Sequence, residues 1–292
     1  MSIMRELWRR TSELFWQHSI LWLPLLCAEL CAFCLNRLTG LATKRIYDWF
    51  LAGRSLLSND PFAPPLDRTA VWKATILSLP LRWTTYFVNL CLYTAAFILT
   101  AMLVEMALRR QQPDVASSLS ALRSYTKRII IFSLKIYALV AIMSGVMYLP
   151  VKYLWPVAIS LSSFAGEHLF PLSVTILSWT CIAWVMTPAG FKLLQAPESQ
   201  WKHAESIRLG RILSILALVV TNAFWYLIQY GEQAIISTAN LSPGPQLQII
   251  YAIGSLLRVF PCVLLFIALS LLAERKIQEP VIDANSEDTA LP

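Results

Sequence analysis

Charged residues are scarce in this 292-residue chain, at 14%, and glycine is scarce too, with only 9 residues. A soluble domain carries about 25% charged residues, so the shortage of charge argues against a surface that faces water everywhere. Hydrophobic residues make up 57% of the chain, and they occur in runs long enough to cross a bilayer. The composition therefore indicates a chain whose main solvent is lipid.

Histidine is also scarce, and no recognised catalytic or phosphate-binding motif is present. The 3 histidines, His18, His168 and His203, are too scattered for the ligand set of a zinc site. The sequence has no His-Glu-x-x-His pattern, no Gly-x-Ser-x-Gly elbow and no phosphate-cradling loop. We therefore expect no enzyme activity, no metal site and no cofactor.

The cysteines give no reason to expect disulfide bonds. All 6 fall inside apolar runs: Cys27, Cys31, Cys34, Cys91, Cys181 and Cys262. Disulfide frameworks belong to water-exposed extracellular segments. The first three cysteines share one helix face, and we interpret them as small packing residues rather than as a thiolate metal site.

Six apolar stretches are each long enough to cross a bilayer as a tilted helix, which needs about 20 residues. The backbone in hydrocarbon must satisfy its own hydrogen bonds, so helices are expected rather than strands. The predicted spans are residues 14–38, 84–108, 129–149, 169–188, 212–230 and 249–273. The predicted fold class is all-α: one polytopic transmembrane bundle over residues 1–276, followed by a disordered acidic tail at 277–292.

Lysine and arginine lie mostly in connections on one side of these spans. Because cytoplasmic loops are enriched in these residues, we expect a bacterial plasma (inner) membrane protein with both termini in the cytoplasm. The basic connection 39–83 disagrees with this orientation, because it falls on the outer side. We expect a small helical cap there. The alternative is that one span is wrong. Segment 151–165, interrupted by Pro150 and Pro156, is interpreted as interfacial or re-entrant.

Three basic stretches, 3–18, 114–128 and 198–211, run directly into predicted spans and carry apolar residues along one helical face. Asp114 can cap the second of them. Such amphipathic helices lie in the headgroup layer, with their basic faces toward lipid phosphates. The expected headgroup contacts are Arg5, Arg9, Arg10, Arg123, Lys127, Arg128, Lys202, Arg208 and Arg211.

The net charge of +7 predicts an anionic lipid partner rather than nucleic acid. The basic residues flank apolar spans instead of gathering in one soluble patch, which suits lipid headgroups. Other membrane proteins, or further copies of this chain, stay open as partners.

Ionisable residues inside hydrocarbon are costly and need a partner or a purpose. Four fall within the predicted spans: Glu29, Glu105, Lys135 and Arg258. Glu29 and Arg258 are predicted at a similar depth, about 13 Å from the outer ends of their helices, and we expect them to pair. Glu105 and Lys135 both fall near the cytoplasmic ends and form a second expected pair, unless Lys135 extends to the headgroups instead.

The opening of the chain carries the motif Glu6-Leu7-Trp8-Arg9-Arg10, followed by Leu21-Trp22-Leu23-Pro24-Leu25-Leu26. With the six-span layout, it resembles bacterial inner-membrane proteins similar to the membrane domain attached to some glycerophosphodiester phosphodiesterases. The resemblance implies a role in the membrane and carries over no functional residue, since no catalytic domain is attached.

Two functions are compatible with these patterns. The first is a non-enzymatic membrane component that organises, binds or handles lipid or partner proteins. The alternative is a transporter of a small solute or lipid, with Glu29 and Arg258 lining its path.

Overall fold

The structure is a computed structural model that describes residues 2–51, 68–161, 170–194, 207–217, 219–220 and 245–273. Its regular elements within these ranges are all helical, which confirms the all-α prediction. They are α1 (Ser2–Gln17), the 3-10 turn η1 (Ser19–Trp22), α2 (Leu23–Phe50), α3 (Arg68–Leu108), α4 (Val115–Leu161), α5 (Phe170–Leu194) and α7 (Pro245–Ala273). Residues 207–217 are helical as well and are called the 207–217 helix.

In the described part of the chain, 4 helical segments are long and apolar enough to cross a membrane: Ser19–Phe50, Thr69–Leu108, Val115–Tyr148 and Phe170–Leu194. They contain all of the second predicted span, nearly all of the third and fourth, and residues 19–38 of the first, whose opening residues belong to α1. Most of the fifth predicted span, 212–230, lies outside the described residues, as does the tail 277–292. The sixth, 249–273, falls within α7, where Val259–Leu272 is a shorter apolar stretch.

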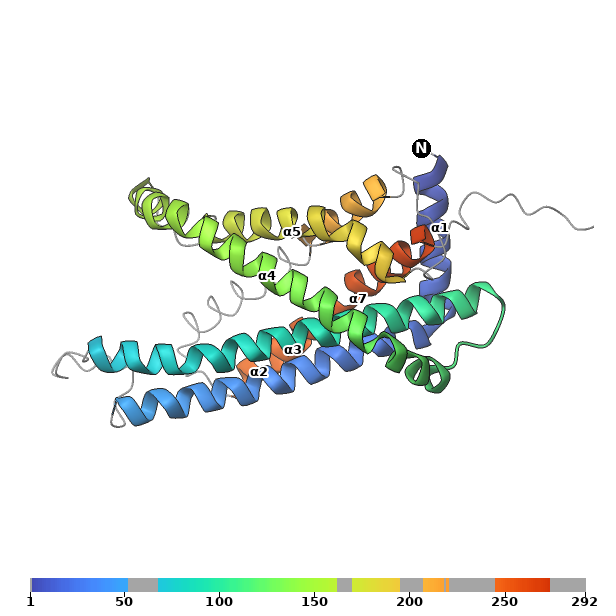
Figure 1. The fold of residues 1–292 in the computed structure, drawn as a ribbon. Coiled ribbons are helices and arrows are strands. Elements are labelled where there is room, and N and C mark those ends of the chain that lie inside the picture. The colour runs from blue at the N-terminus through green and yellow to red at the C-terminus, as the bar shows by residue number, and fades with distance from the viewer. Residues whose placement is uncertain are drawn as a thin grey trace, which may run out of the picture.

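The long helices run back and forth along one axis (Figure 1). α2 and α3 lie side by side in opposite directions, α4 crosses α3, and α5 returns along α4. α7 packs on α1, α2 and α3. α1 stands across the end of the bundle at which α2 begins and α3 finishes, and we call this the α1 end.

One face of α1 is buried. Leu7, Thr11, Leu14 and Phe15 are each at most 8% exposed, and their spacing of three or four residues places them on one side of the helix. Trp22 then folds back, with its indole Nε1 donating to the carbonyl oxygen of Phe15 at 3.2 Å. This contact fixes the turn through which α1 enters the bundle.

The core lies where α1 meets the other helices. Its best-buried members come from α1, η1, α2, α3 and α7: Leu7, Leu21, Leu25, Leu103, Val104, Val263, Ile267 and Leu271. Residues far apart in the sequence meet there, so α1 is part of the folded bundle.

The structure corrects the boundaries of the connection predicted at 39–83. α2 continues to Phe50 and α3 already begins at Arg68, so much of the predicted connection extends the two helices. Three polar pairs join the helices: Asn36 with Asn89 at 2.9 Å, Thr39 with Thr85 at 2.6 Å, and Tyr47 with Thr75 at 2.8 Å. These polar residues therefore form a seam between the two helices.

α4 also differs from the prediction, because it joins segments that were expected to be separate. Its 47 residues span about 70 Å at about 1.5 Å per residue, against about 30 Å of hydrocarbon. Residues 151–161, the described part of segment 151–165, continue this helix. Pro150 and Pro156 do not end it, because neighbouring groups and local adjustments compensate for a missing backbone donor in membrane helices.

Asp114 begins α4 as predicted. Its carboxylate accepts the backbone N–H groups of Ala116 at 3.0 Å and Ser117 at 3.1 Å. These bonds favour the ionised form, so the pKa of Asp114 is lowered from its ordinary value. The cap satisfies two of the four N–H groups that a helix start leaves without a partner.

The 207–217 helix packs closely on α5 through Gly210. A Cβ at this position would lie 2.5 Å from Cζ of Phe191 and 3.2 Å from Cγ2 of Thr187. Because Phe191 is only 2% exposed, its ring has little room to move aside. The absence of a side chain therefore sets the spacing of these two helices.

Gly210→Ala should lower the free energy of unfolding by about 1–3 kcal/mol, the usual cost of overpacking a filled interior. The matched control is Gly145→Ala on α4, because no heavy atom lies within 4 Å of the added Cβ there. That change should leave stability unchanged or raise it by up to about 1 kcal/mol through helix propensity. Denaturant unfolding in detergent measures both, and equal stabilities of the two variants would contradict the close contact.

Candidate functional site

Glu29 lies buried in α2, at 5% exposure. The hydroxyl of Tyr93 on α3 donates to its Oε2 at 2.8 Å. Arg258, the predicted partner, belongs to α7, but its side chain lies outside the described residues. The structure therefore gives Glu29 a partner on α3, and its pairing with Arg258 stays a prediction.

Glu105 forms an ion pair with Arg109, one turn further along α3. Lys135, its predicted partner on α4, has an exposed side chain. A pair at this spacing needs no second helix, because residues four apart are neighbours on a helix surface. The interhelical pairing of Glu105 with Lys135 stays a prediction.

A cavity of about 240 Å³ lies beside Tyr93, between α3, α4, α5 and α7. Its wall is mostly aromatic and aliphatic, with Phe97, Phe132, Trp179, Met186, Phe191 and Phe266 among the lining residues. Most of these residues belong to three of the helical segments long and apolar enough to cross a membrane. An apolar cavity lined by such helices suits molecules that partition into hydrocarbon.

Of the four hydroxyl side chains in the cavity wall, those of Tyr93, Thr94 and Thr187 donate within the protein. Tyr93 donates to Glu29, and Thr94 donates to a backbone carbonyl of its own helix at 2.8 Å. Thr187 donates to the carbonyl of Ala183 at 2.6 Å. Because these donors are engaged, the wall recognises an occupant mainly by shape and apolar contact.

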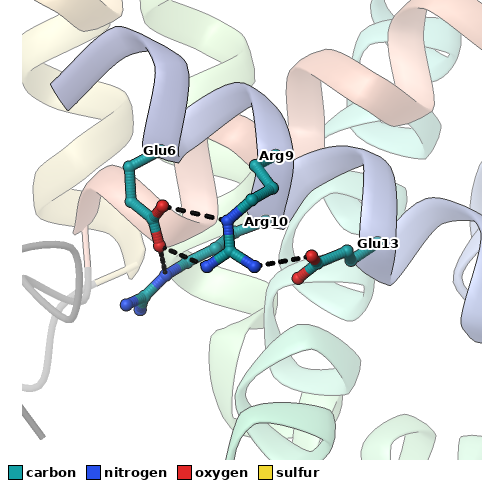
Figure 2. A network of polar contacts seen from close by, with 4 residues as sticks. All are labelled: Glu6, Arg9, Arg10 and Glu13. Carbon is teal, nitrogen blue, oxygen red and sulfur yellow. Dashed lines mark hydrogen bonds and ion pairs between the residues drawn. The ribbon is translucent and has the colours of Figure 1, made fainter. Parts of the chain in front are cut away.

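The arginines of α1 are largely compensated by carboxylates of the same helix (Figure 2). Arg9 donates to both oxygens of Glu6, at 3.0 and 2.7 Å, and to Glu13 at 2.7 Å. Arg10 donates to Glu6 at 2.7 Å. Of the headgroup contacts predicted on this helix, Arg5 is exposed, whereas Arg9 and Arg10 are engaged in this network.

The network shifts the protonation equilibria of its members. Hydrogen bonds from Arg9 and Arg10 lower the pKa of Glu6 to about 2, and Glu6 with Glu13 raises the pKa of Arg9. Glu6 and Arg9 are therefore charged across the physiological range, and much of the positive charge of α1 is neutralised locally.

The basic side chains predicted on α4 are exposed: Arg123, Lys127 and Arg128. Arg208 on the 207–217 helix is exposed as well. Lys202 lies outside the described residues. These positions are compatible with the headgroup prediction, which the structure does not test.

Arg211 has a role that sequence reasoning missed. Its Nε donates to the carbonyl oxygen of Trp184 at 3.1 Å, and its guanidinium lies 4.5 Å from the centre of the Trp184 ring. Pro188 explains this contact: it has no N–H, so the carbonyl four residues earlier loses its intrahelical donor. The only sequence signal is Pro188 itself, which does not say which residue supplies the donor.

Metal ligation finds no support in the described residues, where no group of three or more histidine, cysteine, aspartate or glutamate side chains could hold an ion. Cys27, Cys31 and Cys34 are free thiols on an exposed part of α2. The cavity itself was also missed, because its wall combines residues of α3, α4, α5, α7 and the 207–217 helix, and no local pattern marks it.

Comparison with known proteins found no matching family model, no matching curated protein and no matching solved structure. Inferences about function therefore depend on the geometry described above.

The α1 network gives stability a specific dependence on pH. Glu6 has an ordinary pKa of 4.5 and a folded pKa of about 2, so its contribution is present above about pH 4.5 and is lost as the pH falls toward about 2. Glu6→Gln should reduce the loss of thermal stability between these values, measured in detergent. Asp48→Asn on α2 is the control and should retain the wild-type profile. An identical acid decline in Glu6→Gln and wild type would contradict the role of Glu6.

Proposed function

We propose that this chain is a lipid-handling integral membrane protein without a catalytic site. In this proposal it crosses a bacterial inner membrane six times, with both termini in the cytoplasm. The 4 bilayer-length apolar helices support membrane insertion. The alternating directions of the long helices suit an even number of spans, since α2 begins and α7 finishes at the α1 end.

The observation that carries the proposal is the apolar cavity of about 240 Å³ among membrane-length helices. Lipid acyl chains are the most abundant apolar molecules at that depth in a bilayer. A polar solute would need several unengaged donors or acceptors on the wall, whereas three of its four hydroxyl side chains, those of Tyr93, Thr94 and Thr187, already donate within the protein. The wall therefore favours an acyl chain over a polar solute.

The position of α1 agrees with this role. Its buried face packs into the bundle, while Trp8 and Trp16 are exposed at 64% and 72%. Tryptophan is enriched where hydrocarbon meets water, so we propose that α1 is an amphipathic helix in the headgroup layer of the inner leaflet. The resemblance to the membrane domain of some glycerophosphodiester phosphodiesterases is compatible with such a function.

Filling the cavity tests the proposal. Ala183 lines the cavity and is 8% exposed, so Ala183→Phe should occupy the space of an acyl chain. In proteoliposomes, we expect crosslinking to a phospholipid with a photoactivatable acyl chain to fall several-fold. The control is Ala141→Phe on the exposed surface of α4, which should crosslink like wild type. Equal crosslinking by all three proteins, with unchanged stability, would contradict lipid handling through this cavity.

The alternative is transport of a small solute or lipid along Glu29 and Arg258. The observation that favours it is Glu29 itself, a carboxyl group buried in a membrane-length helix, since such groups mark substrate and proton pathways. The competing role is a structural clamp, in which Tyr93 and Arg258 hold Glu29 in place.

Single and double substitutions separate these roles. If Glu29 and Arg258 form a clamp, Glu29→Gln and Arg258→Gln should each lower protein level and thermal stability, because each leaves a buried charge without its partner. The double variant should then partly recover both. Normal level and stability in both single variants would contradict the clamp and favour the pathway.

A further inference from the structure

Two arginines of the 207–217 helix lie next to the cavity. Arg208 and Arg211 are three residues apart on the 207–217 helix, so their side chains are neighbours on its surface. Ser214, three residues further on, lines the cavity. Each step of three residues advances about 4.5 Å along a helix. The two arginines and the cavity therefore lie along the same helix within a span of about 9 Å.

α5 also contacts both the arginine pair and the cavity. Trp184 stacks on the guanidinium of Arg211, and Thr187, Gly190 and Phe191 of the same helix line the cavity. The Thr187 hydroxyl also lies 3.4 Å from the hydroxyl of Ser214. The basic pair and the apolar cavity are thus built from the same pair of packed helices.

Arg211 is held in place before any ligand arrives. Its Nε is bonded to the Trp184 carbonyl at 3.1 Å, and a guanidinium carries four further N–H donors. A guanidinium fixed in this way loses little conformational freedom when it binds a phosphate, and its planar fork suits phosphate oxygens.

The charge of this pair is not neutralised by its own helices. α5 and the 207–217 helix contain no aspartate or glutamate, and they add an exposed Lys192. On α1, by contrast, Glu6 and Glu13 are bonded to Arg9. Within the described parts of α5 and the 207–217 helix, the pair beside the cavity therefore keeps the net positive charge that attracts an anion.

We infer that the cavity binds one acyl chain of an anionic phospholipid, whose phosphate is bound by Arg208 and Arg211. This inference rests on the proposed lipid-handling function and names its ligand class. The apolar wall accounts for the chain, and the arginine pair, whose two helices carry no carboxylate in their described parts, accounts for the anionic headgroup. The 207–217 helix lies toward the α1 end of the bundle (Figure 1), so the bound headgroup would lie in the leaflet next to α1.

The experiment uses the full chain in detergent with defined lipids, and native mass spectrometry reports the affinity for each lipid. Wild type should bind phosphatidylglycerol more tightly than phosphatidylcholine. Arg208→Gln should weaken phosphatidylglycerol binding about tenfold, the loss expected for a charge-assisted hydrogen bond, and Arg208→Lys should restore part of it. Arg208 is exposed, so these variants should fold. The matched control is Arg82→Gln, an exposed arginine in the part of α3 remote from the α1 end.

Each result is informative. If Arg208→Gln and Arg82→Gln bind both lipids like wild type while Ala183→Phe loses both, lipid handling stands and the headgroup site is refuted. If Ala183→Phe binds both lipids like wild type, the proposed function itself fails. Inorganic phosphate is the third arm: displacement of phosphatidylglycerol by millimolar phosphate would overturn a lipid site in favour of a free-anion site, and retention supports the lipid.

Discussion

Hydrocarbon offers no hydrogen-bond partners, and the arrangement of this bundle depends on that constraint. Helices satisfy most backbone hydrogen-bonding groups internally. Where a backbone group loses its partner, or a polar side chain is buried, another side chain must supply the hydrogen bond. Pro188 removes one donor from α5, and Arg211 replaces it from the next helix at 3.1 Å. Glu29 brings a carboxyl group into α2, and Tyr93 supplies a donor to it from α3 at 2.8 Å. Each compensation also fixes how two helices pack.

The same constraint shapes the candidate site. Three of the four hydroxyl groups in the cavity wall donate to carbonyl or carboxylate oxygens of the protein, which leaves a wall of mostly aromatic and aliphatic surface. Positive charge lies outside this wall, at Arg208 and Arg211 of the 207–217 helix. Apolar space beside this charge matches the two parts of a phospholipid, whereas α1, with Arg9 and Arg10 bonded to carboxylates, contributes packing and exposed tryptophans.

Local sequence patterns predicted the elements better than their connections. Apolar runs located the long helices, and Asp114 marked the start of α4 because capping is a local interaction. Helical structure was expected within connection 39–83, but as a separate cap, and only the contacts of Thr39 with Thr85 and of Tyr47 with Thr75 show that it continues two packed helices. The cavity and the Arg211–Trp184 contact join residues from separate helices, so no single stretch of sequence encodes them.

The most direct test of the central claim is an experimental structure of the full chain in a lipid nanodisc containing phosphatidylglycerol. The account predicts density for one acyl chain in the cavity between α3, α4, α5 and α7, continuous with a phosphate beside Arg208 and Arg211. A cavity closed by Phe191 and Phe266, or a water-filled path that reaches Glu29 from the cavity, would contradict it. The second outcome would favour transport over lipid binding.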